Sequence, residues 1–490
     1  MTLARPPEAA RGLAGLAGLI GRHRLFCALL AAAAALRVLV QVSYRPALLF
    51  YGDSIAYLAN AAHLYPESIR PAGYPAFLRA VLIVHDLAAV PALQHVFGLV
   101  TGGLVYALIR RLGGGPVAGS IAAAPVLFDA YDLNLEQHVL SETLFTLLVV
   151  HALVVLLWRS RPSLAACIAT GILLAAAALT RSVGLALIAP ALAFAIVRGG
   201  LVRTLALALA FAVPLAGYAT WYSTVPNGSF ALTGRDGYFL YGRVADFASC
   251  SGMHLSPVDR KVLCDPRPPA DRPSPNYYVW HQWSIHHYRR FPHKPSRRNA
   301  ILESFALGVI HRQPLAYAET VLGDMAHYAS FRRTTGPLDE SITQWQFHVD
   351  GQLSPRAVTR LVFEADTWGG SVGGWQTGQR LLAGYQRVCY TPGTLLAVAL
   401  LLAVVAAVVG GTGVGRGVRA ETLTLAAAGV LLPLTAAMTS MFDFRYLFPA
   451  LALLPAAGVL GATTLAARSR ALRPAGPGPV APGRGLTRGR

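Results

Sequence analysis

An acidic residue and an arginine lie in the first polar segment of the chain, and together they have the chemistry to remove a proton beside a phosphate. Asp53 closely follows an apolar run at 25–43, and Arg70 lies in the same polar segment. A carboxylate near an apolar interface is costly unless it is paired or functional. Two structural alternatives stay open. Asp53 could cap a helix that begins at Ile55, which the spacing favours, and the pair could be an ordinary surface ion pair.

Four further carboxylates cluster at the neighbouring ends of two later apolar runs, 115–130 and 140–158, namely Asp129, Asp132, Glu136 and Glu142. Glu142 enters the second of these runs, at 140–158. Its charge suits the positive end of a helix dipole, so Glu142 could simply begin a helix. It suits a polar pocket equally well, and the sequence leaves both interpretations open.

Other chemistries have less support. The histidines at 281, 286, 287 and 293 have spacing that can bind a metal, but no cysteine or acidic pattern accompanies them, which favours a solvated loop. The glycine runs at 113–115 and 410–411 lack the lysine and the strand-to-helix context of a nucleotide-binding loop. We therefore expect no nucleotide substrate. A divalent metal or other cofactor is left open without being indicated.

Membrane helices must position these residues. Only 13% of the 490 residues are charged and 54% are hydrophobic, whereas a soluble domain carries about 25% charged residues. The formal charge of +19 favours contact with anionic lipid over nucleic acid, because the arginines gather at the ends of apolar runs. The 40 arginines against two lysines, with abundant Ala and Gly, are typical of a GC-rich bacterium.

Ten apolar runs predict an all-α polytopic membrane protein with about ten transmembrane helices. The runs are 25–43, 91–109, 115–130, 140–158, 163–179, 183–197, 204–222, 392–410, 421–440 and 446–467. A single helix over 163–197 would be about 52 Å long, whereas the hydrocarbon core is about 30 Å thick. The chain must therefore turn at Thr180-Arg181-Ser182, the polar interruption of this stretch.

The positive-inside rule predicts a plasma-membrane protein with both termini in the cytoplasm, since the short basic loops then share that side. Residues 1–24 and the Pro/Gly/Arg-rich tail 468–490 are cytoplasmic in this topology, and we expect the tail to be disordered. The same alternation puts Arg181 and Arg445 at the outer face, against the rule. With Arg70 they could bind an anionic lipid headgroup, or they could snorkel to ordinary phospholipid phosphates.

This topology divides the chain into two membrane regions and two outer segments. Transmembrane helices 1–7 occupy 25–222, with an outer loop at 44–90, and helices 8–10 occupy 391–467. Residues 223–390 between them are long enough for one mixed extracytoplasmic domain.

That outer domain combines helical stretches, notably 299–331, with Pro-rich loops such as 265–275. Cys250 and Cys264 face an oxidising compartment in this topology and close a short loop, so we expect a disulfide between them.

The order of these motifs resembles the GT-C superfamily of membrane glycosyltransferases, in the branch that holds protein O-mannosyltransferases and lipid A aminoarabinose transferases. The resemblance covers about 25–222 and 392–467. Its motifs are Asp53 in the first outer loop, Arg70–Pro75, Ser141-Glu142, Leu179-Thr180-Arg181 and Phe444–Pro449. Each motif is short, and their order and shared membrane face carry the resemblance.

The resemblance implies inverting transfer of a hexosyl or pentosyl group from a polyprenyl-phosphate donor to a hydroxyl of a protein, lipid or cell-wall glycan. Asp53 takes the place of the proposed base, although Ser54 stands where the family often has a second acid. The donor phosphate would bind to Arg70, Arg181 and Arg445. The donor or acceptor pocket would contain Tyr57, Tyr74, Glu142 and Tyr446.

Two other classes of function stay open, a lipid or polysaccharide transporter or flippase, and a non-catalytic cell-envelope scaffold. Transporters usually show inverted repeats and broken helices around a midplane site, and neither is evident in the sequence. A scaffold gives no reason for Asp53 and the arginines to converge. A pocket lined by these residues and open to lipid would favour the enzyme.

Overall fold

The computed structural model describes residues 21–50, 52–280, 294–349, 368–370, 373–409 and 418–471. Over these residues the protein is helical and has no β-strand; two isolated bridges join Arg45 to Gly373 and Leu48 to His138. The all-α polytopic fold expected from the sequence is confirmed.

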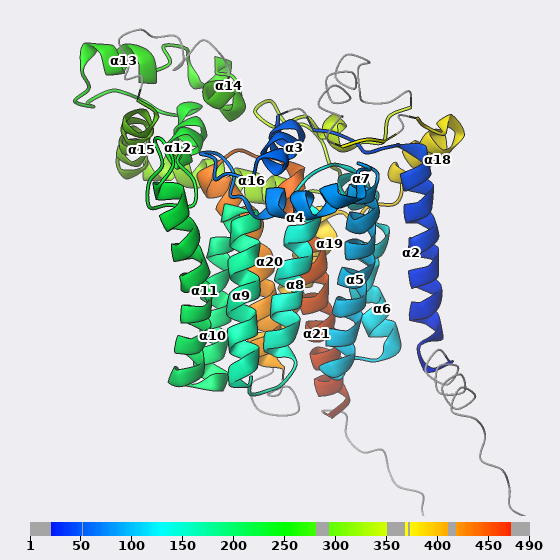
Figure 1. Cartoon of the computed structure of the whole chain (residues 1–490). Helices are drawn as coiled ribbons and strands as arrows, with labels where there is room; N and C mark the ends of the chain where they lie inside the picture. Colours follow the sequence, from blue (N-terminus) through cyan, green and yellow to red (C-terminus); the bar gives the residue numbers. More distant parts are fainter. Residues whose placement is uncertain are drawn as a thin grey trace, which may run out of the picture.

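In the described part of the chain, a bundle of ten apolar helices forms the body of the molecule (Figure 1). They are α2 (Arg24–Ser43), α5 (Ala89–Arg111), α6 (Pro116–Phe128), α8 (Glu142–Leu157), α9 (Leu164–Thr180), α10 (Ile188–Gly199), α11 (Leu201–Ser223), α19 (Gly393–Val409), α20 (Arg419–Thr439) and α21 (Ala450–Ala471). Each corresponds to one of the ten apolar runs. Within the described residues, six helical stretches are long and apolar enough to cross a membrane, the third of them formed by 182–199; α6, α8, α9 and α19 are apolar but shorter.

The predicted turn after α9 is present. Helix α9 ends at Thr180, Arg181 is extended, and a 3-10 helix, η2 (Ser182–Leu187), leads into α10. Figure 1 shows α9 and α10 side by side. The length argument was therefore sufficient to place this break.

The remaining elements gather at one end of the bundle, which we call the site end (Figure 1). The first outer segment forms α3 (Asp53–Ala62), α4 (Gly73–Val81) and η1 (Leu82–Val84), and α7 (Ala130–Gln137) precedes α8. The described parts of 223–390 form α12 (Asp236–Ala245), α13 (Pro257–Leu263), η3 (Pro269–Asp271), α14 (Pro275–Trp280), α15 (Pro295–Arg312), α16 (Pro314–Tyr328), η4 (Ile342–Trp345) and α18 (Gln376–Gln386). The described chain begins and ends at the opposite end of the bundle.

The helical stretch expected over 299–331 is present over most of its length and consists of two helices. Helix α15 ends at Arg312 and α16 begins at Pro314, with Gln313 between them. Proline has no backbone N–H to continue a helix and disfavours the helical conformation in the residue before it. The break therefore follows from Pro314.

The helices of the segment 223–390, which we call the outer helices, have their own hydrophobic core. Aromatic and aliphatic side chains of α12, α14 and α15 pack together, and this core includes Tyr241 and Phe305. Cys250 and Cys264, the pair expected from the sequence, are joined in a disulfide at its edge, with a Cα–Cα distance of 6.1 Å. Helices α12 and α16 both contact α20, which fixes this unit above the bundle.

A buried ion pair connects the segment 223–390 to the bundle. Arg333 donates to both carboxylate oxygens of Asp129, at 3.1 and 2.8 Å, and to the carbonyl of Thr391. Its guanidinium lies over the ring of Tyr131 at 4.5 Å, and both charged side chains are almost fully buried. Asp129 also caps α7, so one carboxylate joins three segments.

Candidate functional site

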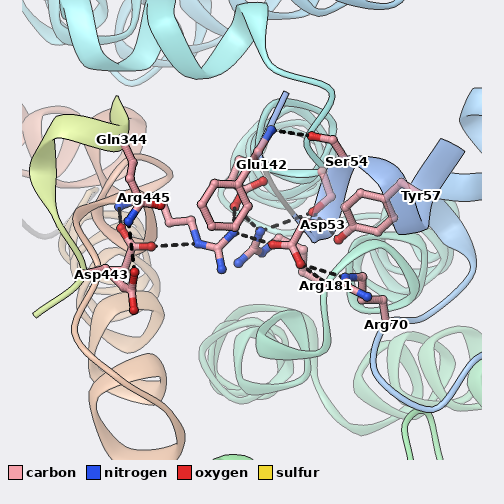
Figure 2. Close-up of polar contacts among 12 residues, drawn as sticks. Asp53, Ser54, Tyr57, Arg70, Glu142, Arg181, Gln344, Asp443 and Arg445 are labelled. Carbon is pink, nitrogen blue, oxygen red and sulfur yellow. Dashed lines mark hydrogen bonds and ion pairs between the residues drawn. The ribbon is translucent and has the colours of Figure 1, made fainter. Parts of the chain in front are cut away.

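Asp53 lies at the centre of the site, between two arginines from opposite ends of the chain. Arg70 donates to Oδ1 of Asp53 through Nε at 2.8 Å and also through Nη2. Arg445 donates to Oδ2 through Nη1 at 2.6 Å. Figure 2 shows the carboxylate between the two guanidinium groups. Both oxygens are therefore held by charged hydrogen bonds, which are stronger than neutral ones.

The backbone around Asp53 explains why this side chain is not a helix cap. Gly52 is the N-cap of α3, with φ of 96°, a left-handed conformation that glycine adopts without strain. Asp53 is the first residue of the helix and makes no cap hydrogen bond. Ser54 anchors this start by accepting from the Phe50 amide and donating to the Val139 carbonyl. The capping alternative for Asp53 is thus wrong.

The second arginine is positioned by a buried aspartate. Asp443 is the N-cap of η7 (Phe444–Leu447), where it accepts from the backbone amide of Arg445 and contacts Arg445 Nε at 3.0 Å. Trp345 donates its indole N–H to the same carboxylate at 2.7 Å. The Arg445 guanidinium also lies over the rings of Phe50 and Tyr446. These contacts restrict the rotamers that the Arg445 side chain can adopt.

The third arginine, Arg181, joins the cluster through Glu142. Arg181 forms an ion pair with Glu142, and Arg445 lies 3.7 Å from the same carboxylate oxygen. Arg181 also donates to the Ser141 hydroxyl, which is within hydrogen-bond distance of the Tyr57 hydroxyl. All three arginines therefore belong to one network with Asp53.

A close backbone approach brings the Arg70 and Arg181 segments together. A Cβ added at Gly73, the first residue of α4, would lie 2.5 Å from the carbonyl oxygen of Leu179. Only glycine allows this contact. It places the segment that carries Arg70 beside the turn that carries Arg181.

Burial divides the carboxylates of the site into two kinds. Asp53 is 17% exposed, whereas Glu142 and Asp443 are each 2% exposed. The three arginines are 12–16% exposed, so they reach the surface of the site together with Asp53. Glu142 and Asp443 lie beneath them, which neutralises part of the arginine charge and fixes its position.

The two kinds of carboxylate also differ in pKa. Burial alone would raise the pKa of Asp53, but the charges of Arg445 and Arg70 and their hydrogen bonds outweigh it and hold the pKa well below its usual range. Burial raises the pKa of Asp443 to about 6, against the opposing charge of Arg445. The arginines thus favour the ionised form of Asp53, whereas burial favours the neutral form of Asp443.

These groups line a pocket of about 760 Å³. Its bundle side carries Asp53, Tyr57, Arg70, Arg181, Arg445 and Tyr446. A second, apolar side runs between η2 and α20 and includes Val183, Leu185 and Ala186. The outer helices contribute a third side, with Phe239 and Trp280 among its residues. Leu185 is 40% exposed, so the apolar side reaches the outer surface of the bundle.

The remaining pocket residues expected from the sequence have different places. Tyr57 and Tyr446 line the pocket, and Glu142 lies directly beneath two of its arginines. Tyr74 is fully buried behind Tyr57, at 4.8 Å between ring centroids, and donates its hydroxyl to Gln94. Tyr74 therefore supports the site from behind and does not line it.

Sequence reasoning missed Asp443 and Trp345 as parts of the site. Asp443 stands two residues before Arg445, and this spacing, which fits an N-cap followed by a short helix, is the signal that was available. Trp345 offered none, because its contact crosses 98 positions of the chain.

The described residues contain no group of three or more His, Cys, Asp or Glu side chains arranged to hold a metal. The four histidines at 281–293 lie outside the described residues. The site as described is built from arginines, carboxylates and aromatic rings.

No protein-family model matches the chain, and no curated protein matches it. Among solved structures, it is similar to the crystal structure of ArnT from Cupriavidus metallidurans bound to undecaprenyl phosphate. The two are 16% identical, the match covers 90% of this chain and 78% of that chain, and the TM-score is 0.34. Values this low assign neither a family nor a function, so the function must be argued from the residues of the site.

Proposed function

We propose that the protein is an inverting glycosyltransferase that moves a sugar from a polyprenyl-phosphate donor to an acceptor hydroxyl at the outer face of the plasma membrane. The observation that carries this proposal is the pairing of Asp53 with Arg70 and Arg445 in a pocket with an apolar side. An anionic lipid substrate needs cationic and apolar surfaces side by side. A non-catalytic scaffold needs neither.

The distribution of arginine supports the proposed orientation of the chain. At the end of the bundle opposite the site, helix termini and connections carry Arg22, Arg110, Arg111, Arg159, Arg161, Arg198 and Arg203. By the positive-inside rule, that end is proposed to be cytoplasmic. The site end and the outer helices are then proposed to be extracytoplasmic.

The donor phosphate is proposed to bind to Arg70, Arg181 and Arg445. The prenyl chain would leave between η2 and α20, past Leu185, and remain in lipid. In the reaction, an acceptor oxygen forms a bond to the anomeric carbon while the bond from that carbon to the phosphate oxygen breaks. The leaving polyprenyl phosphate takes the electron pair as an anion, so it needs no general acid, and the arginines stabilise its growing charge.

Asp53 is proposed to accept the acceptor proton, and the arginines explain when it can do so. A carboxylate whose pKa is strongly lowered is a weak base. The donor phosphate competes with Asp53 for Arg70 and Arg445, and each contact transferred to the phosphate raises the pKa of Asp53 toward its ordinary value. Donor binding thus converts a resting ion pair into a base.

Reconstitution tests this proposal directly. The purified protein in liposomes is given a panel of radiolabelled polyprenyl-phosphate sugars together with cell-envelope fractions, and transfer of label is measured. We expect one donor to label one fraction. The proposal fails if no donor in the panel supports transfer by a protein that is folded and inserted.

A further inference from the structure

The outer helices give the pocket a second end with chemistry unlike that of the arginine end. Phe239 of α12 and Trp280 of α14 line it, with ring centroids 5.9 Å apart in an edge-to-face arrangement. Trp280 is 43% exposed, so much of its ring is open to the surroundings. Exposed aromatic rings inside a pocket are typical of ligand sites, because they contribute a large contact area.

Polar groups surround these rings. Asn276 donates its amide to Glu340, and Gln344 donates to the other oxygen of that carboxylate at 3.0 Å. Glu303 also lines the pocket and is exposed, and its carboxylate forms no hydrogen bond or ion pair within the described part of the chain. Its two oxygens are therefore available to accept hydrogen bonds from a ligand.

The two ends of the pocket differ in charge. The bundle side presents three arginines together with Asp53 and Asp443, whereas the outer helices present the carboxylates Asp236 and Glu303. Glu340 lies between the two sides, and its backbone amide donates to the Phe442 carbonyl. Like charges in contact oppose binding, so a second anion is disfavoured at the outer end. Hydroxyl groups are favoured there, because each can donate to a carboxylate in a charge-assisted hydrogen bond.

We propose that the outer end is a binding subsite for a sugar ring that carries no negative charge. The C–H edges of the ring stack on the electron-rich face of Trp280. The hydroxyls of the sugar donate hydrogen bonds to Glu303 and Glu340 and form hydrogen bonds with the side-chain amide of Asn276. This subsite deepens the proposed transferase function, because it would hold the sugar of the donor or the acceptor beside Asp53.

Direct binding tests the subsite without requiring transfer. The full-length protein in lipid nanodiscs is titrated calorimetrically with trisaccharides of glucose, mannose and galactose, and with trigalacturonic acid as the charged counterpart of galactotriose. We expect at least one neutral trisaccharide to bind. If galactotriose binds, its affinity should exceed that of trigalacturonic acid by about tenfold or more. No binding by any neutral trisaccharide, or tighter binding of the acid, overturns the proposal.

Variants at Trp280 and Glu303, each with a control elsewhere in the chain, make the test specific. Trp280→Ala should lower the affinity for the neutral trisaccharide by about tenfold, and Trp280→Phe should keep most of the wild-type affinity. Trp375→Ala is the matched control, because Trp375 is 48% exposed and does not line the pocket. Glu303→Gln should raise the affinity for trigalacturonic acid, whereas Glu319→Gln on α16 should leave this affinity unchanged. Unchanged affinity in Trp280→Ala overturns the proposal.

Competition identifies which sugar the subsite holds. Polyprenyl phosphate without a sugar should leave trisaccharide binding in place, because it occupies the arginine end. Displacement by a polyprenyl-phosphate sugar assigns the subsite to the donor ring, and simultaneous binding assigns it to the acceptor. If trisaccharides bind but no donor supports transfer, the transferase proposal fails and the sugar subsite stands.

Discussion

Arg445 and Asp53 are 392 positions apart in the chain, and Nη1 of Arg445 lies 2.6 Å from Oδ2 of Asp53. Asp53 begins the short helix α3 after the first apolar helix, and Arg445 lies in η7, the turn before the last apolar helix. The contact exists only when the first and last parts of the bundle are assembled. It therefore links the fold of the membrane region directly to the charge state of the site.

Asp53→Asn should reduce transfer by about 10²–10⁴-fold, the usual contribution of general-base catalysis. The amide cannot accept the proton, although its oxygen still accepts a hydrogen bond from one arginine. Turnover with saturating donor is the measurement, and Asp271→Asn, an exposed acid on η3, is the control. Transfer at the wild-type rate would show that Asp53 is not the base.

Arg445→Lys should lower kcat/KM by about 10–100-fold even though the charge is kept. The guanidinium contacts Asp53 and Glu142 through Nη1 and Asp443 through Nε, a geometry that one ammonium group cannot reproduce. The control is Arg380→Lys on α18, whose side chain is exposed. Equal kcat/KM in the two variants would contradict the role of Arg445.

The KM for the donor should fall as the pH decreases through about 6. Burial raises the pKa of Asp443 to about 6, so below this value its carboxylate becomes neutral. Arg445 then loses one negative neighbour, and its charge attracts the donor phosphate more strongly. Steady-state kinetics between about pH 5 and 7 measure the effect. Asp443→Asn should give a low KM without this inflection, and an inflection that persists in the variant rules out Asp443 as its source.

The same shift affects stability with a defined sign. The pKa of Asp443 is higher in the folded protein than its ordinary value, so protonation favours the folded state. This contribution is complete at low pH and is lost as the pH rises through about 6. In a thermal-unfolding series in detergent, the difference in Tm between wild type and Asp443→Asn should therefore grow as the pH rises from about 4 to about 6 and then level off.

Arg333→Ala should destabilise the protein by about 3–5 kcal/mol, because it leaves the Asp129 carboxylate buried without its charged partner. Arg332→Ala, at the exposed neighbouring position, should have little effect. Thermal unfolding in detergent compares the two variants. Similar Tm values would mean that the Arg333–Asp129 pair does not hold the outer chain to the bundle.

The sequence was sufficient for the bundle but not for its finer breaks. Long apolar runs become helices because the bilayer leaves the backbone no other way to satisfy its hydrogen bonds, and the length of 163–197 required a turn at Arg181. The break before Pro314 was also readable, since proline ends a helix, although the sequence analysis marked 299–331 only as helical.

The site was only partly predictable for a physical reason. Asp53, Arg70, Arg181 and Arg445 could be singled out because each is costly near a membrane interface and so needs an explanation. Their contacts could not be derived, because each joins elements that are distant in sequence. Tyr74 shows the limit most clearly, since its place in a motif gave no sign that its hydroxyl points away from the pocket to Gln94.

The pocket wall comes from two groups of elements, the bundle with its short connections and the outer helices α12, α14 and α15. The groups proposed to act in the reaction lie on the bundle, and the Phe239–Trp280 pair lies on the outer helices. Exchanging the outer helices between related chains would therefore change which molecules are selected while the reaction itself is preserved. In such an architecture, new specificities arise by grafting, without rebuilding the machinery embedded in lipid.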